Sequence, residues 1–250
     1  MIAAVLRVLH QVVERPRPCS YLAAETAALE YRLIVDASPE EHEAMLARGW
    51  RRFGAAYFRP ACAPCGECIS LRVPVASFVP SRGQRRAARK GAGLRREVGP
   101  VRVDSARLEL HAAWHADREE ARGWDGMALG RKDYVRDFAF PHSCAREVAY
   151  WDDGAVGGPR LVAVGLCDET PRAWSAIYFF YDPAYASCSP GVLNVLDLIA
   201  LAREEGKEHV YLGYRVSGCA SMRYKATYAP HELLVGRPQA EETPRWVAGP

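Results

Sequence analysis

The order of apolar patterns in the last hundred or so residues restricts the fold of this chain more than any other feature. Strand-type runs occur at residues 147–151, 160–167, 174–181 and 208–216. Before the last of them, residues 193–204 have the apolar spacing of a helix. The last four of these runs, in the order strand–strand–helix–strand, predict an α/β sheet. Ser189 as N-cap and Pro190 at the first helical position mark the expected start of the helix.

A helix that begins beside the end of a strand offers a binding place for an anionic or ester group, because its first backbone N–H groups have no partner within the helix. The arrangement fits an acyltransferase of the acetyltransferase-like fold, among many other α/β folds. Coenzyme A-dependent enzymes of that fold carry an Arg/Gln-x-x-Gly-x-Gly/Ala loop before the helix. Residues 187–194 contain one glycine and no basic residue. Coenzyme A is therefore a poor candidate for the acyl donor.

The first part of the chain has a different pattern and predicts a Cys-containing α+β domain. Residues 39–48 have the acidic first turn and basic last turn of a helix. Strand-type runs lie on both sides of it, at residues 32–35, 55–59 and 70–75. We expect a first domain at residues 1–100, whose last 20 residues form a helix and then a linker or bend. A mixed-sheet, acetyltransferase-like domain at residues 101–250 would end in a loose tail at residues 239–250.

Length and composition place the chain among ordinary globular proteins. Its 250 residues suffice for one large domain or two small ones, and 49% of them are apolar and 25% charged. No apolar stretch of about 18 residues exists, so we expect no transmembrane helix. Residues 1–13 are apolar, but Arg7 and His10 interrupt them and a small-residue cleavage site is missing, which argues against a signal peptide. We expect a cytoplasmic protein that binds no membrane.

Cysteines cluster near the start of the chain. Cys62, Cys65 and Cys68 lie within seven residues, and Cys19 stands upstream. A tight triplet in a cytoplasmic chain indicates metal binding, with Cys19 as a fourth sulfur, and leaves zinc and an iron–sulfur cluster as alternatives. The other interpretation is a set of reduced thiols without metal. The scattered cysteines are interpreted as packing residues: Cys144, Cys167, Cys188 and Cys219.

Basic residues also concentrate in the first part of the chain. The net charge is only +3, yet the first 100 residues hold 16 Lys and Arg against 9 Asp and Glu. Seven cations follow one another without an acidic residue, and the first five share one helix face: Arg82, Arg85, Arg86, Arg89, Lys90, Arg95 and Arg96. Such a face favours phosphates, and RNA more than DNA, because no sequence-reading DNA motif is present. The alternative is a solvated, Arg-rich surface.

The segment at residues 209–234 is dense in Tyr, Gly and basic residues. A strand that ends at Tyr214 would place phenols at a sheet edge, and residues 222–225 would follow as the wall of a site. There, phenols and a Lys can orient an ester and an incoming amine. The other interpretation is an amphipathic element whose aromatic side chains pack and whose cations face water.

Four segments together resemble the arginyl-tRNA–protein transferases. They are CSYL at residues 19–22, YFRPACAPCGECISLRVPV at 57–75, FVPSRGQRRAARK at 78–90 and VYLGYRVSGCASMRYKATYAPHELL at 210–234. The single early cysteine and the triplet are more similar to the bacterial branch, the aspartate/glutamate leucyltransferases. Three positions depart from the family pattern: Ala23 replaces a proline, Arg215 a tryptophan and Ser221 a lysine. These departures concern substrate choice and activity more than the fold.

The resemblance implies transfer of leucine from leucyl-tRNA to the α-amine of proteins that begin with Asp or Glu, which marks them for degradation. The chemistry requires no cofactor. In this reading the catalytic candidates are Tyr178, Tyr211, Tyr214 and Lys225, and the substrate-binding candidates are Gly213, Arg223 and Tyr224. Lys225 or Arg223 would receive the acidic side chain of the acceptor. The alternatives are an arginyltransferase, an inactive metal-stabilised RNA-binding protein and, least favoured, a coenzyme A-dependent N-acyltransferase.

Overall fold

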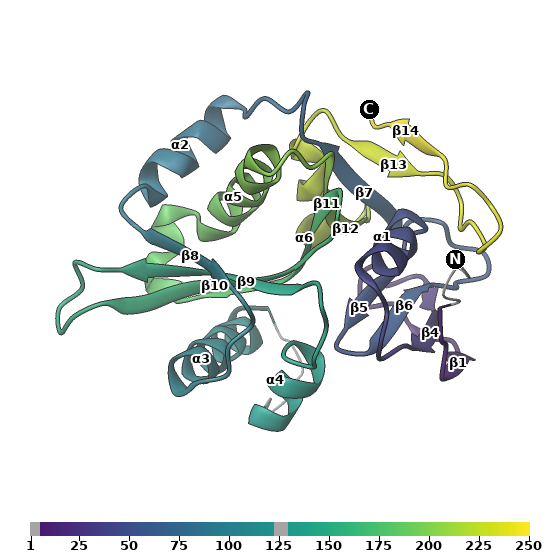
Figure 1. The fold of residues 1–250 in the computed structure, drawn as a ribbon, viewed down its shortest axis with the longest axis horizontal. Coiled ribbons are helices and arrows are strands. Elements are labelled where there is room, and N and C mark those ends of the chain that lie inside the picture. The colour runs from purple at the N-terminus through teal and green to yellow at the C-terminus, as the bar shows by residue number, and fades with distance from the viewer. Residues whose placement is uncertain (1–5, 123–129) are drawn as a thin grey trace.

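The computed structural model describes residues 6–122 and 130–250, which form two main β-sheets with helices packed against them (Figure 1). A four-stranded sheet has the order β1-β4-β6-β5, and an eight-stranded sheet has the order β14-β13-β7-β12-β11-β10-β9-β8. The predicted fold class, an α+β N-terminal part joined to a mixed-sheet part, is confirmed. Of residues 1–13, the first five lie outside the described residues. In the described part of the chain, no helix has the length and apolar character needed to cross a membrane.

The small sheet carries one helix on one of its faces. Its strands are β1 (His10–Val13), β4 (Leu29–Leu33), β5 (Arg51–Phe53) and β6 (Ala56–Pro60), and a short β2–β3 ladder (Arg17–Pro18, Thr26–Ala27) lies in the loop after β1. Helix α1 (Pro39–Ala47) begins with a capping box in which Ser38 and Glu41 bond each other's backbone N–H. Met45, Trp50 and Tyr57 pack between α1 and the sheet. The predicted helix at residues 39–48 is confirmed.

The large sheet is covered on both faces. Its strands are β7 (Ile69–Pro74), β8 (Arg95–Gly99), β9 (Ala145–Asp152), β10 (Arg160–Glu169), β11 (Ala173–Tyr181), β12 (His209–Arg215), β13 (Glu232–Leu234) and β14 (Trp246–Ala248). Helices α2 (Arg82–Gly91) and α5 (Pro190–Glu204) lie over one face, and α3 (Ser105–Arg122) and α4 (Arg131–Asp137) lie over the other (Figure 1). The turns η1 (Pro183–Cys188), α6 (Ala220–Arg223) and η2 (Tyr224–Thr227) complete the chain. Leu198, Ile199 and Ala202 of α5 are buried in the main core.

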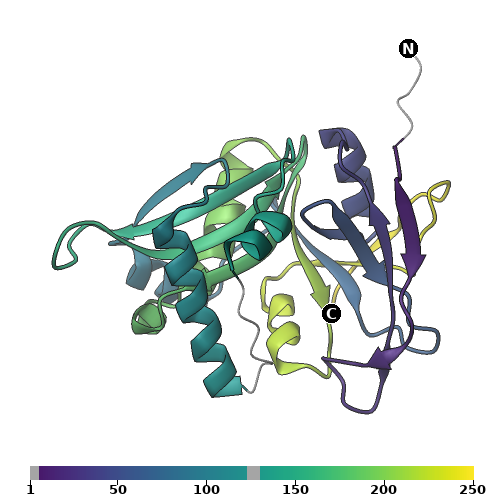
Figure 2. The same cartoon turned by 90° about the horizontal axis from the view of Figure 1, so that it is seen from below.

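The predicted strand–strand–helix–strand order is present as β10, β11, α5 and β12. Strands β11 and β12 are parallel, but they pair only from Ala173 to Ser175. Beyond Ser175 the two strands diverge, and the small sheet lies beside the opening; Figure 2 shows the two sheets side by side. Backbone groups of β11 that face this gap therefore have no ladder partner on β12.

Four local predictions need correction. The residues after α2 were expected to form a linker, but β8 pairs with β9, where Val98 lies opposite Val148. The tail was expected to be loose, but β14 pairs with β13. The phenols of β12 were expected at a sheet edge, but β12 lies between β7 and β11 in the interior. Ser189 is at the N-cap position and Pro190 at the first helical position, as predicted, but Ser189 has φ 55° and its side chain makes no capping hydrogen bond.

The domain boundary at residue 100 stays a prediction. The large sheet takes β7 and β8 from before that residue.

Candidate functional site

Two cavities meet where β11 and β12 diverge. The first, here called the inter-sheet cavity, has a volume of about 660 Å³ and lies between the exposed face of the small sheet and the ends of β11 and β12. The second, here called the helix cavity, has a volume of about 370 Å³ and lies at the start of α5. Four residues line both cavities: Ala176, Ile177, Leu212 and Lys225. The two cavities therefore share one wall, and Lys225 belongs to it.

Gly213 shapes the junction of the cavities. It has φ +76°, a left-handed conformation that favours glycine. The register between β12 and β7 shifts at this point. A β-carbon placed on Gly213 would lie 3.5 Å from Arg51 Nε and 3.6 Å from Lys225 Nζ, so both cations border the same point of β12. The sequence prediction that Gly213 and Lys225 lie at one site is consistent with this placement.

Lys225 is half-buried at the junction with its amine turned toward β12. Its Nζ donates a hydrogen bond to the Tyr214 backbone O at 2.8 Å and lies 3.8 Å from Met222 Sδ. Burial and the neighbouring Arg51 guanidinium lower the pKa of Lys225 to about 7. A large fraction of the amine is therefore neutral at pH 7 and able to accept a proton.

Arg51 is a second cation in the inter-sheet cavity, and the sequence reasoning missed it. Its side chain extends from β5 to β11, where Nη1 donates to Ser175 Oγ at 2.8 Å and Nη2 donates to the Ala176 backbone O. The residue is only 8% exposed. Within the described part of the chain it forms no ion pair with a carboxylate, and burial lowers its pKa. One sign of this role is present in the sequence, which is the position of the arginine in a short strand between two apolar segments.

Arg52, the next residue, is neutralised by a buried network. Its Nε donates to Asp168 Oδ2 at 3.0 Å, and its Nη2 donates to Asp168 Oδ1. The backbone N–H of Cys144 donates to His142 Nδ1, which places the ring proton of His142 on Nε2. The bonds then run from His142 to Tyr57 Oη, from Tyr57 to His42 Nδ1, and from His42 Nε2–H to Asp168 Oδ2, at 2.9, 3.0 and 2.9 Å.

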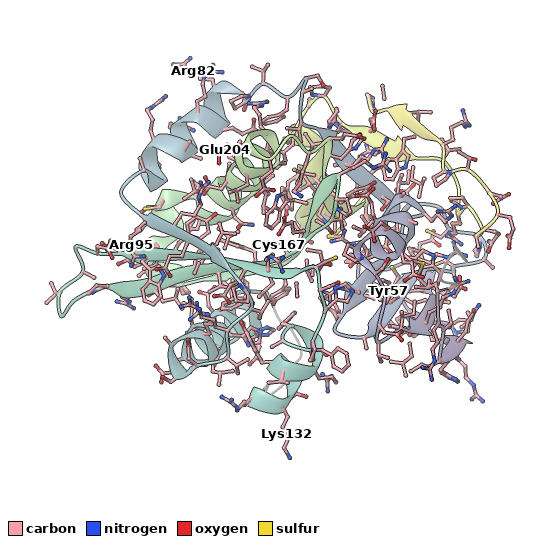
Figure 3. The ribbon with its side chains drawn as sticks, in the orientation of Figure 1. Tyr57, Arg82, Arg95, Lys132, Cys167 and Glu204 are labelled. Atoms are coloured by element: carbon pink, nitrogen blue, oxygen red, sulfur yellow. The ribbon has the colours of Figure 1, made fainter. Side chains whose placement is uncertain are left out.

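This network joins the small sheet to β10 and holds β5 in place. Tyr57, labelled in Figure 3, lies on the face of the small sheet that α1 covers. Asp168 is 1% exposed, and the charge of Arg52 together with the hydrogen bonds from Arg52 and His42 holds the pKa of its carboxyl well below the usual range. Since Arg52 and Asp168 neutralise each other, Arg51 supplies the uncompensated positive charge on this strand.

The structure separates the predicted phenols. Tyr178 lines the helix cavity, and its hydroxyl forms a hydrogen bond with His115 Nε2 at 3.0 Å. Tyr214 lines the inter-sheet cavity, but its hydroxyl donates to the Gly49 backbone O at 2.8 Å. Tyr211 lines neither cavity, and its hydroxyl accepts a hydrogen bond from Arg72 Nη1 at 3.3 Å. The catalytic roles of these phenols stay predictions.

The other two substrate-binding candidates lie close to Lys225 in the chain. Tyr224 lines the helix cavity and is 46% exposed. Arg223 ends α6 and lies outside both linings.

The four cysteines predicted as metal ligands lie near one another. Burial and the neighbouring thiols of Cys62, Cys19 and Cys65 raise the pKa of Cys68 to about 12. The loop that carries the triplet is held by Arg237, which donates to the backbone O of Cys62 and of Cys65 at 2.9 and 2.7 Å. Among residues 6–122 and 130–250, however, no three His, Cys, Asp or Glu side chains converge as metal ligands. A metal at these cysteines stays a prediction.

The seven predicted tRNA-binding cations divide into two groups. The five on α2 are exposed, and Arg82 lies at the outer surface of the helix (Figure 3). Lys90 Nζ donates to the Ser187 backbone O at 3.0 Å and so connects α2 to η1, directly before α5. Arg95 and Arg96 lie on β8 and form ion pairs instead, Arg95 with Asp153 at 2.8 Å and Arg96 with Asp197 at 3.2 Å.

Two family models match this chain. Residues 17–86 match "Arginine-tRNA-protein transferase, N terminus" and residues 106–235 match "Arginine-tRNA-protein transferase, C terminus". The chain belongs to this family. The transferase is thus an enzyme of the aminoacyl-tRNA–protein transferase class, as the resemblance of its motifs implied.

Full-length relatives carry a narrower name. The aspartate/glutamate leucyltransferase of Helicobacter hepaticus is 31% identical to the transferase over 91% of this chain and 93% of its own length. The protein of the same name from Chromobacterium violaceum is 34% identical over 94% of both chains. Among solved structures, FemX is similar with a TM-score of 0.46 and 10% identity, over 76% of this chain and 75% of its own.

Proposed function

We propose that this transferase moves leucine from leucyl-tRNA to the α-amine of proteins that begin with Asp or Glu. In this proposal the helix cavity receives the aminoacylated 3′ end and the inter-sheet cavity receives the acceptor N-terminus. The observation that carries the proposal is the position of Lys225, whose pKa is about 7, in the common wall of the two cavities. The names of the full-length relatives support the same donor and acceptor.

The placement of α2 supports the helix cavity as the donor side. The exposed cations of α2 are suited to tRNA phosphates, which release condensed counterions when neutralised. Helix α2 packs beside α5, and the bond from Lys90 to Ser187 brings it to the turn that leads into α5. A strand of RNA that follows α2 therefore arrives at the start of α5, where Ser189 and Gly191 line the cavity.

The lining of the cavities supports leucine over arginine as the transferred residue. No carboxylate belongs to the lining of the helix cavity within the described residues. The inter-sheet cavity has one, Asp137, and its oxygens already accept from Arg136 at 2.7 and 2.8 Å. A transferred arginine would lack an ionic partner, whereas Ile177, Leu212 and Val192 suit an aliphatic side chain.

The pair of Arg51 and Lys225 supports an acidic acceptor. Because both cations border Gly213, one Asp or Glu residue can present its side-chain carboxylate to Arg51 and its α-amine to Lys225. A buried guanidinium without a carboxylate partner gains most from such a ligand, since the ligand restores its lost solvation.

The proton transfers follow from the acidity of the groups. An α-ammonium has a pKa of about 7.7–8.0, so neutral Lys225 can take one of its protons. The amine nitrogen then bonds to the ester carbonyl carbon, and the bond from that carbon to the ribose oxygen breaks. A second proton passes from the nitrogen to the leaving ribose oxygen, and Lys225 releases the first to solvent. The step balances without a cofactor.

A transfer assay tests the proposal. Purified protein receives leucyl-tRNA or arginyl-tRNA, each with a labelled amino acid, and peptides that begin with Asp, Glu or Ala. We expect label from leucyl-tRNA on the Asp and Glu peptides only. Transfer of arginine would support the arginyltransferase instead. Salt-dependent tRNA binding without any transfer would support the inactive RNA-binding protein.

The proposal also concerns where in the cell the enzyme acts. Because its donor is charged tRNA, which is made in the cytoplasm, we propose that the enzyme acts there.

The cysteines Cys19, Cys62, Cys65 and Cys68 stay candidate ligands of zinc or an iron–sulfur cluster. The zinc and iron content of protein purified without oxygen tests them, with Cys68→Ser as the comparison.

A further inference from the structure

We propose that the open face of the small sheet is a subsite for the second to fourth residues of the acceptor, and that it selects apolar side chains there. This inference rests on the proposed function, because it assumes that an acidic N-terminal residue sits at Arg51 and Lys225. It adds a preference for sequence beyond that first residue.

A row of side chains crosses the small sheet in register. Arg51 of β5 lies opposite Phe58 of β6, Phe58 lies opposite Tyr31 of β4, and Tyr31 lies opposite Val12 of β1. Directly opposed residues of antiparallel strands project to the same face of a sheet. The row therefore leads from the buried cation to the free edge of the sheet without another charged side chain.

Burial along the row decreases from the inner end to the edge. Arg51 is 8% exposed, Phe58 and Tyr31 are half-buried, and Val12 is 44% exposed. The rings of Tyr31 and Phe58 are 6.1 Å apart, and the ring of Phe53 lies 5.4 Å from that of Phe58. A continuous aromatic surface therefore starts at the cation and opens to solvent.

The two faces of the small sheet differ in what covers them. One face is covered by α1 through Trp50 and Met45. The other face forms a wall of the inter-sheet cavity, with Leu29 and Leu33 beside the row. Leu33 is 40% exposed and Phe53 is 37% exposed. Apolar side chains on an open face that continues into a binding cavity indicate a ligand that extends along it.

The length of the row fits a short stretch of extended chain. Neighbouring strands are about 4.8 Å apart, so the three steps from Arg51 to Val12 span roughly 14 Å. Extended peptide advances about 3.3 Å per residue, so about four residues cover that distance. With residue 1 at Arg51, residues 2–4 lie over Phe58 and Tyr31. We therefore assign this face to the acceptor chain, because in the proposed function only the acceptor is bound at Arg51, the inner end of the row.

Acceptor peptides with matched first residues test the subsite. One set begins Asp-Phe-Val, one begins Asp-Gly-Gly and one begins Asp-Ser-Asn, all with the same remaining sequence and with leucyl-tRNA as donor. We expect kcat/KM to be about tenfold higher for the apolar set than for the other two. Tyr31→Ala and Phe58→Ala should remove that preference, so that kcat/KM for the apolar set falls to the level of the other two sets. Tyr31→Phe keeps the ring and should keep the preference.

The controls separate three kinds of failure. Val156→Ala changes a fully exposed valine in the turn between β9 and β10, and its preference should equal that of the unaltered protein. Equal kcat/KM for all three sets overturns the subsite but leaves the proposed function intact. No transfer to any set overturns the proposed function itself. A change in KM for leucyl-tRNA in Tyr31→Ala, with the peptide preference intact, assigns the face to the donor and overturns the inference. If Phe58→Ala fails to fold, Tyr31→Ala still tests the subsite.

Discussion

Lys225 combines a half-buried position with an amine whose pKa allows it to exchange a proton near neutral pH. Only one oxygen, the Tyr214 backbone O, accepts from its Nζ among the described residues. The nearby Arg51 and the loss of water both disfavour its charged form and lower its pKa to about 7. These conditions are typical of a general base and not of a structural lysine.

Replacement of Lys225 tests that role. Lys225→Met keeps the length of the side chain and removes the amine, so we expect transfer to fall about 10²- to 10⁴-fold. Lys225→Arg should not restore activity, because a guanidinium does not lose its proton at neutral pH. Affinity for tRNA, measured by filter binding, should stay unchanged in both variants. An equal loss of tRNA affinity would show that Lys225 acts in binding.

The pH dependence of transfer follows from the same pKa. The neutral amine is the active form, so kcat/KM should rise with pH through about 7 and then level off. The α-amine of the acceptor adds a second rise near its own pKa, about 7.7–8.0. Peptides with an acceptor amine of different acidity separate the two, because only the second rise should move with the peptide.

Arg51 should determine the choice of acceptor. Arg51→Met should reduce kcat/KM for Asp and Glu peptides at least tenfold and leave the low rate with Ala peptides nearly unchanged, because only the acidic peptides lose an ionic partner. The ratio of Asp to Ala transfer is the measurement. Arg160→Met removes an exposed arginine and serves as the control. A uniform loss for all peptides would indicate that Arg51 supports the fold through Ser175.

Sequence reasoning named Lys225 and Gly213 as candidates, with Lys225 as a receiver of the acidic side chain, but it did not name Arg51, for a physical reason. Lys225 and Gly213 lie in one segment, and their types alone suggested a site wall. Burial of Arg51 depends on contact between β5 and β11, whose partner Ser175 is more than a hundred residues away in the chain. A pair of arginines in a short strand gives no sign of which one is neutralised. That difference follows from Asp168, which comes from the other sheet.

Helix α2 is an element that local sequence determines well. Ser81 and Gln84 form a capping box, and the five cations occupy one face as their spacing predicted. Strands β8 and β14 were missed because each is short and at or near an edge of the sheet. Their strand conformation comes from pairing with β9 and β13, which periodicity within a few residues does not reveal.

The charge on α2 should set the affinity for tRNA. The double variant Arg85→Glu and Arg86→Glu should weaken tRNA binding and reduce the slope of log affinity against log salt by about 2, since two phosphate contacts are lost. Arg95→Gln should have a smaller effect, because Arg95 is already paired with Asp153 and Glu97. Binding measured over a series of salt concentrations distinguishes the two. Equal effects would show that β8 contacts the RNA as strongly as α2.

At the scale of the whole molecule, the buried network predicts how stability depends on pH. Burial lowers the pKa of His142 to about 3 and also lowers that of His42, so the folded protein keeps both rings neutral. The unfolded chain binds protons near pH 6.5. Stability is therefore complete above pH 6.5 and falls as the pH drops toward 3, by about 1.4 kcal/mol per pH unit for His142. His42 adds to the loss between pH 6.5 and its own lowered pKa. Asp168 adds to the loss below about pH 3.9.

Urea unfolding between pH 4 and 8 measures this effect. A free energy of unfolding that stays constant from pH 7 to pH 4 would contradict the assigned neutral rings. In His142→Phe the baseline stability should fall because Tyr57 loses a hydrogen-bond partner, but the slope between pH 6.5 and 4 should be smaller. An unaltered slope in that variant would assign the effect to other groups.

The order of strands in the large sheet has a consequence for synthesis on the ribosome. Strand β7 lies between β12 and β13, both of which are translated long after it. At about 5–20 residues per second, β7 waits on the order of 10 s for its neighbours. During that time its apolar residues Leu71 and Val73, which end fully buried, have no sheet to join. The two cavities, too, form only when β12 and η2 have left the ribosome, so a chain that ends before η2 has no complete site for a charged tRNA.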